Sequence, residues 1–214
     1  MYIPAAFAET DLETLGAFVD AHPLATLALV VDEQAHVDHM PFMRTTPLAM
    51  GGSLIAHVAQ GNPTWRHVGD GVSAVLAFTG ASAYVSPSLY PSKKVTHQVV
   101  PTWNYATLHL HGRLRCLHDA ESKRDIVDRL TRHMESTRAE PWSITDAPAD
   151  YIEKMLRGIV GLQFEIERIE AKFKASQNRA DQDRRGVVAG LSRDPATTEA
   201  AALAASALEK APNG

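Results

Sequence analysis

Short apolar segments separated by turn-forming residues recur along this sequence and constrain its fold more than any other feature. Residues 25–31 are almost entirely apolar, a polar stretch follows at 32–34, and residues 35–42 then alternate in polarity. This pattern predicts a β-hairpin. Strands so close together, joined by Gly, Pro and Asn, favour an antiparallel barrel or sandwich. Further strands are expected at residues 53–58, 72–78, 83–86, 102–117 and 159–173.

Helices are expected to flank this mainly β fold. Asp119 is suited to cap a helix that runs to about residue 138. Its apolar face would consist of Ile126, Val127, Leu130 and Met134. A shorter helix is expected at residues 149–156, ended by Gly158, and an earlier one should end before Pro23.

The chain length suits one domain with a small appendage. We expect the domain to span residues 1–190, with a helical insertion around 119–157. The charged and Ala-rich stretch 191–214 predicts a weakly ordered or helical tail.

The composition disfavours several classes of protein. A net charge of -4 argues against a nucleic-acid binder, whose domain is usually basic. Cys116 is the only cysteine, so neither an intrachain disulfide nor a cysteine metal cage can form. No apolar run approaches the ~18 residues of a membrane span, so we expect a cytoplasmic protein without membrane contact.

The segment from His57 to Arg66 is the first that goes beyond ordinary barrel wall. A strand ends there, a glycine turn follows, and Asn62-Pro63 is typical of a helix start. A helix N-terminus beside His57 and Arg66 could hold a phosphate, because free N–H groups and cationic side chains converge there. The segment taken alone favours an ordinary capped helix.

Residues 100–105 form the second such segment. In an extended chain Trp103 and Tyr105 share one side, and Thr102 and Asn104 share the other. Amphipathic aromatic residues beside hydroxyl and amide groups suit a flat heteroaromatic ligand. They equally suit a core or dimer contact.

The third segment, residues 172–179, combines cations, amides and a serine where the last strand ends, and it includes Lys174, Gln177 and Arg179. Such donors can serve an anionic ligand, although a charged strand end is more often only solvated. A metal site is not predicted, because no HExxH or Cys/His spacing accompanies the histidines.

Considered together, these segments resemble the PaiB family. The resemblance is carried, in order, by Met1-Tyr2-Ile3-Pro4, His39-Met40-Pro41-Phe42, Gly61-Asn62-Pro63-Thr64-Trp65, Val100-Pro101-Thr102-Trp103-Asn104-Tyr105, Gly158-Ile159-Val160-Gly161 and Ser176-Gln177-Asn178-Arg179. Members are described as FMN-binding negative transcriptional regulators. The resemblance implies an FMN-binding split β-barrel of the flavin-reductase and pyridoxamine-phosphate-oxidase type, built as a homodimer with flavin at the subunit interface.

The resemblance also implies which residues surround FMN. Those on the barrel strands and the following turn would be His39, Phe42, His57, Asn62, Trp65 and Arg66. Those of the other two segments would be Thr102, Trp103, Asn104, Tyr105, Lys174, Gln177 and Arg179.

The function is open between two classes at this stage. The family description indicates a regulator acting through flavin or partner binding, but direct DNA binding is disfavoured because no basic helix-turn-helix is evident. The alternative is a flavin-dependent oxidoreductase. Haem binding through His109, His111 or His118 is a less favoured third possibility.

Overall fold

The structure is a computed structural model that describes residues 1–210. The chain divides into two compact units. The terminal unit contains Met1–Asp11, Thr79–Leu108 and the chain from Glu170 onward, and the central unit contains Leu12–Phe78 and His109–Ile169.

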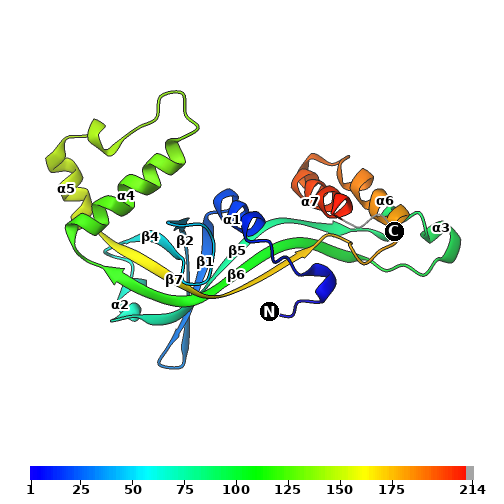
Figure 1. The fold of residues 1–214 in the computed structure, drawn as a ribbon, viewed down its shortest axis with the longest axis horizontal. Helices are drawn as coiled ribbons and strands as arrows, with labels where there is room; N and C mark the ends of the chain where they lie inside the picture. The colour runs from blue at the N-terminus through cyan, green and yellow to red at the C-terminus, as the bar shows by residue number, and fades with distance from the viewer. Residues whose placement is uncertain (211–214) are drawn as a thin grey trace. The chain divides into compact units, whose positions relative to one another are not determined.

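Seven strands of the described chain form an antiparallel sheet in the order β2-β1-β5-β6-β7-β4-β3 (Figure 1). The strands are β1 (Leu24–Val31), β2 (Gln34–Pro41), β3 (Met43–Arg44), β4 (Ser53–Ala59), β5 (Val72–Val85), β6 (Thr102–Leu117) and β7 (Ile159–Lys174). The predicted mainly β fold with flanking helices is confirmed. The three longest strands, β5, β6 and β7, each pass from one unit into the other.

The predicted break between strands 72–78 and 83–86 is wrong, because β5 is continuous from Val72 to Val85. The sequence between them contains Gly80 and looks like a turn. Gly80 is not among the residues with positive φ, so the chain stays extended through it.

The predicted hairpin is confirmed. β1 and β2 pair antiparallel from Leu24 opposite Pro41 to Val31 opposite Gln34. Asp32 and Glu33 form the two-residue turn with φ of 49° and 62°, since tight hairpin turns that match the strand twist need positive φ. This turn places Leu27 and Leu29 in the core.

The helices of the central unit are α1 (Leu12–Ala21), α2 (Thr64–Val68), α4 (Ala120–Glu135) and α5 (Ala149–Arg157), with a 3-10 turn at Ile144–Asp146. The Asp119 side chain caps α4 by accepting a hydrogen bond from Ser122 N at 2.7 Å, as predicted. Ile126 and Leu130 pack against Met43 and Ile55. Met134, expected on the same apolar face, is instead 44% exposed in the last turn of α4.

The terminal unit has its own core beneath α6 (Asp181–Leu191) and α7 (Thr198–Glu209) (Figure 1). The buried residues of this core are Ala83, Val85, Tyr90, Val187, Leu191, Ala200, Ala201 and Ala204. The remaining elements of the unit are α3 (Lys93–Thr96) and 3-10 turns at Ala5–Phe7, Pro87–Leu89 and Pro195–Thr197.

Part of the predicted tail therefore packs as helix α7. Residues 211–214 of that tail lie outside the described residues, and the predicted domain boundary at 190 stays a prediction. None of the helices within residues 1–210 combines the length and apolarity that crossing a membrane requires.

Helix α6 approaches the chain at Leu89 closely at two glycines. A Cβ at Gly186 would lie 2.2 Å from the Leu89 carbonyl oxygen, whereas a Cβ at Gly190 would meet the Leu89 side chain, with Cδ2 at 2.4 Å. A side chain can rotate away, but a backbone carbonyl cannot without moving the segment.

Gly186→Ala should therefore destabilise the protein by about 1–3 kcal/mol through overpacking. Gly190→Ala, the matched control with the same gain in helix propensity, should cost clearly less. Urea unfolding of both variants measures the difference. Equal midpoints would show that the Leu89 backbone does not confine α6.

Candidate functional site

The predicted site residues fall into two groups, one in each unit. The central unit holds His39, Phe42, His57, Asn62, Trp65 and Arg66. The terminal unit holds Thr102, Trp103, Asn104, Tyr105, Lys174, Gln177 and Arg179.

In the terminal unit, β7 and the turn after it bring together three cations, Lys172, Lys174 and Arg179, which we call the cation cluster. The Lys174 ammonium donates to the Trp103 carbonyl oxygen at 2.7 Å and to the Thr102 hydroxyl. The strand β7 thereby places Lys174 in contact with two of the predicted residues at the start of β6.

The other two cations lie over aromatic rings. Lys172 Nζ is 5.2 Å from the ring centroid of Tyr105 and 5.6 Å from that of Tyr2, while the side chain is only 9% exposed. The Arg179 guanidinium carbon lies 5.1 Å from the ring centroid of Tyr90. Aromatic faces attract cations without cancelling their charge.

Among the described residues, none of the three cations forms an ion pair with a carboxylate. Burial lowers the pKa of the Lys174 ammonium below its ordinary value, and the charges of Lys172 and Arg179 lower it further, against an opposing contribution from Tyr105. The cluster therefore carries positive charge that the described residues do not neutralise.

The amide side chains of this unit build the turn after β7. Asn104 is fully buried and exchanges hydrogen bonds with the Ser176 hydroxyl at 3.0 and 3.2 Å. Gln177 accepts from Ala175 N at 2.7 Å and donates to the Phe173 carbonyl at 2.5 Å. Ser176 has φ 67°, a strained conformation that these bonds hold in place.

Two aromatic side chains offer flat surface in the same unit. Trp103 on β6 is 51% exposed and Tyr84 on β5 is 52% exposed. Their ring centroids lie 6.1 Å apart at a tilt of 56°. Trp103 therefore presents an accessible ring, and its own carbonyl oxygen is held by Lys174.

In the central unit, Asp38 organises the turn between β4 and α2. Its carboxylate accepts hydrogen bonds from Asn62 Nδ2 at 2.5 Å and Thr64 Oγ1 at 2.9 Å. Asn62 Oδ1 in turn accepts from Thr64 N at 2.9 Å. The helix starts at Thr64 with Pro63 as its N-cap, one residue later than predicted, because the Asn62 side chain closes the turn before it.

The hydrogen bonds of Asp38 also set its pKa. Partial burial alone would raise the pKa of this carboxyl, but hydrogen bonds from Asn62, the His39 N–H and Thr64 outweigh it and hold the pKa below its ordinary value. Asp38 is therefore a carboxylate that the fold stabilises in its charged form.

Trp65 and Arg66 form a cation–aromatic pair in the central unit, with the guanidinium carbon 5.3 Å from the ring centroid. Trp65 Nε1 donates to the Gln60 carbonyl at 3.0 Å, and His118 packs edge-on against the indole at 5.8 Å. Arg66 itself is exposed. This pair lies directly after the turn that Asp38 organises.

The other predicted residues of the central unit differ in accessibility. His57 Nδ1 is buried without a hydrogen-bond partner among the described residues, and burial lowers the pKa of this histidine. His39 is exposed. Phe42 is 1% exposed and packs edge-on against Phe164, so its ring belongs to the core.

Comparison with solved structures supports the predicted fold. The FAD and haem binding protein from Mycobacterium smegmatis matches with a TM-score of 0.59 and 23% identity, covering 82% of this chain and 77% of that one. The flavocytochrome Anf3 from Azotobacter vinelandii matches with a TM-score of 0.52 and 14% identity, covering 78% and 69%. The fold is that of the split-barrel flavoproteins.

The chain belongs to the family described as "Putative FMN-binding domain", which it matches over residues 1–168. It is 31% identical to the protease synthase and sporulation protein PAI 2 of Bacillus subtilis, over 91% of this chain and 90% of that protein. The resemblance to the PaiB family is confirmed.

The predicted set of flavin contacts leaves out four residues that the structure places in these arrangements. Lys172 belongs to the cation cluster, and the Tyr90 ring lies against its Arg179. Tyr84 pairs with Trp103, and Asp38 organises the turn before α2. Lys172 was visible as the partner of Lys174 on one face of a strand. The other three become recognisable only through pairings distant in sequence.

Asp38→Asn tests the hydrogen bonds that the Asp38 carboxylate accepts from Asn62 and Thr64. Loss of the charge-assisted hydrogen bonds should destabilise the protein by about 1–2 kcal/mol at neutral pH. Because the folded-state pKa lies below the unfolded value of about 3.9, this contribution is complete above that value and is lost as the pH falls through the folded-state pKa.

Urea unfolding of wild type and variant between about pH 7 and pH 3 measures this dependence. Asp70→Asn, at an exposed carboxylate after α2, is the control and should leave stability unchanged. A wild-type advantage that does not shrink in acid would contradict the assignment.

Proposed function

We propose that the protein binds FMN noncovalently and that the cation cluster receives the flavin phosphate. The observation that supports this proposal is the absence of a carboxylate partner for Lys172, Lys174 and Arg179 among the described residues. Like charges gathered in a partly buried place repel one another, so such a cluster is suited to a polyanion. A phosphate monoester with close to two negative charges fits this requirement.

The aromatic residues of the same unit suit the flavin ring. Trp103, with Tyr84 beside it, offers half-exposed flat surface near the Lys174 ammonium. A bound flavin would supply electron or hydride transfer, and the protein would orient it. Asn104 and Gln177 then act by holding the turn that carries Arg179, since their amides are occupied there.

For the central unit, the proposed flavin contacts remain His39, His57, Trp65 and Arg66. Asn62 acts indirectly, because it holds the turn that precedes Trp65 and Arg66. Phe42 also acts indirectly, because its ring packs against Phe164 of β7.

As the family resemblance implies, we propose a homodimer with flavin at the subunit interface. Light scattering of the flavin-loaded protein tests this, and a monomer that retains tight FMN would refute it.

The first experiment is the absorption spectrum of the purified protein and of its supernatant after heat denaturation. Flavin peaks at about 370 and about 450 nm in the supernatant would support the proposal. A colourless protein that fails to bind added FMN would refute it. A Soret band would favour haem instead.

Lys174→Met tests the phosphate assignment. Loss of a charge-assisted hydrogen bond should weaken FMN about 10- to 100-fold. Riboflavin, which lacks the phosphate, should bind nearly as before. Lys154→Met, on the exposed face of α5, is the control. Equal losses for FMN and riboflavin would place the phosphate elsewhere.

The lowered pKa of Lys174 predicts a pH dependence. FMN should bind more weakly as the pH rises through this pKa, beginning below the ordinary lysine value of about 10.4, because deprotonation removes a cluster charge. Lys174→Arg keeps its charge, so its decline should be shallower. Fluorescence titrations from about pH 8 to pH 10 compare the two. Identical profiles would exclude Lys174 as the titrating group.

The role of the bound flavin follows from a second measurement. A regulator that acts through flavin or partner binding should not turn over a nicotinamide donor, whereas a flavin-dependent oxidoreductase should. DNA binding, where present, should weaken steeply with salt. We propose the regulatory role because of the family resemblance. Steady oxidation of NADH or NADPH by the flavin-loaded protein would refute this role and favour the enzymatic one.

A further inference from the structure

We propose that Tyr90 is a positioning residue for Arg179 and that the α6–α7 helices thereby belong to the architecture of the ligand site. This inference rests on the proposed function, because it assigns a task to a cation of the cluster. The Arg179 guanidinium lies over the Tyr90 ring, 5.1 Å from its centroid.

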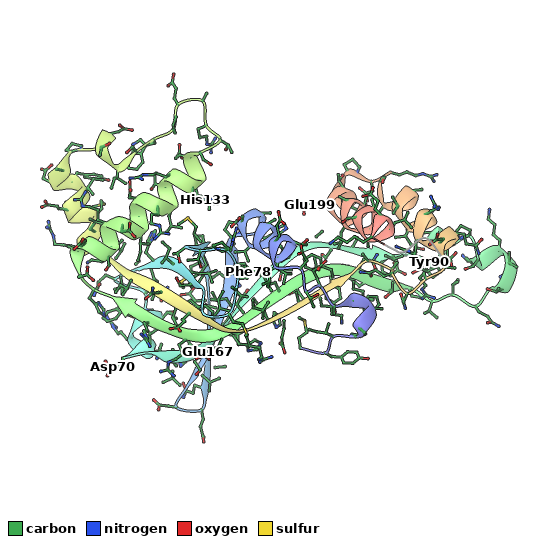
Figure 2. The ribbon with its side chains drawn as sticks, viewed as in Figure 1. Asp70, Phe78, Tyr90, His133, Glu167 and Glu199 are labelled. Carbon is green, nitrogen blue, oxygen red and sulfur yellow. The ribbon has the colours of Figure 1, made fainter. Side chains whose placement is uncertain are left out.

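Tyr90 is held more firmly than a surface aromatic would be. Tyr90, labelled in Figure 2, is 2% exposed. It packs with Val187 and Leu191 of α6 and with small residues of α7. Its backbone N–H donates to the Pro87 carbonyl at 3.2 Å. A ring fixed in this way can define where a flexible arginine lies.

Helix α6 clamps the segment that carries Tyr90. The buried Asp183 carboxylate accepts two hydrogen bonds from Ser92, from its N–H at 3.0 Å and its hydroxyl at 2.7 Å. On the same helix, Gly186 allows the Leu89 carbonyl to approach closely. Leu89 and Ser92, which flank Tyr90 in the sequence, are therefore both held against α6, and this fixes the position of Tyr90.

The ring face suits this task better than a carboxylate would. A carboxylate would orient the arginine but would also neutralise it, whereas a cation–π contact orients the guanidinium and leaves its charge for a ligand. Lys172, whose ammonium lies over the rings of Tyr105 and Tyr2, is held in the same way. The same mode of support at two cations indicates that retained charge is what the cluster requires.

The hydroxyl of Tyr90 supplies an internal control. It is buried and has no hydrogen-bond partner among the described residues. Tyr90→Phe removes only this group and keeps the ring. If the ring face positions Arg179, Tyr90→Phe should bind FMN within about twofold of wild type and should be at least as stable, since an unpaired buried hydroxyl is costly.

Two replacements remove the attraction, and the second of them also preserves the volume of the ring. Tyr90→Met eliminates the aromatic ring. Pentafluorophenylalanine in place of Tyr90 reverses the sign of the ring quadrupole, so that the ring face repels a cation, and it creates no cavity. Both should weaken FMN about 3- to 30-fold relative to Tyr90→Phe, with little change for riboflavin. The fluorinated ring keeps the test valid if Tyr90→Met folds poorly.

A double-mutant cycle with Arg179→Gln separates positioning from general packing. If Tyr90 acts through Arg179, the fluorinated ring should cause no further loss of FMN affinity in the Arg179→Gln protein. Additive losses would overturn the inference. A loss of affinity in Tyr90→Phe would also overturn it, because the hydroxyl would then contact the ligand.

Titration with inorganic pyrophosphate, followed by the midpoint of thermal unfolding, keeps this test separate from the proposed function. If wild type binds no FMN but binds pyrophosphate in a way that depends on the Tyr90 ring, the flavin proposal fails and the positioning role stands. If wild type binds FMN and the fluorinated protein binds it equally, only the positioning role fails.

Discussion

Three cations of the terminal unit are held in place without being neutralised, and this constraint sets what the rest of the unit must provide. Lys172 and Arg179 lie against tyrosine rings, and Lys174 donates to a carbonyl and a hydroxyl. Each contact fixes a position but leaves a net charge, and the three charges repel one another. The surrounding structure must offset this repulsion, and it does so through an apolar core shared by β5, α6 and α7.

Amides and cations have separate tasks in both units. Asn104 and Gln177 shape the turn before Arg179, and Asn62 shapes the turn before Arg66. A buried amide must satisfy both its donor and its acceptor, so it is well suited to fix irregular backbone. An amide used in this way has little left for a ligand, whereas the cations beside it retain free charge. In the segments 57–66 and 172–179, the amide side chains therefore fix the backbone, and the cations next to them remain available to a ligand.

Local rules predicted the elements whose determinants are local. The β1–β2 hairpin follows from a two-residue polar turn, and α4 follows from the Asp119 cap. The continuity of β5 through Gly80 was missed because glycine permits a turn without requiring one. Met134 was misplaced because helical spacing alone does not show which turn of α4 leaves its apolar side chain exposed, and Met134 is 44% exposed in the last turn.

The candidate site was predictable in its residue types but not in its pairings. Lys174 and Trp103 were identified from composition and resemblance, but the contacts of Arg179 with Tyr90 and of Lys172 with Tyr105 join residues far apart in sequence. The family match ends at residue 168, before any of the three cations. The resemblance to the PaiB family extends to residues 176–179, so the cation cluster lies outside the matched domain but within the family resemblance. The family match points to FMN, and the unneutralised charge points to the phosphate, which is the part that distinguishes FMN from riboflavin.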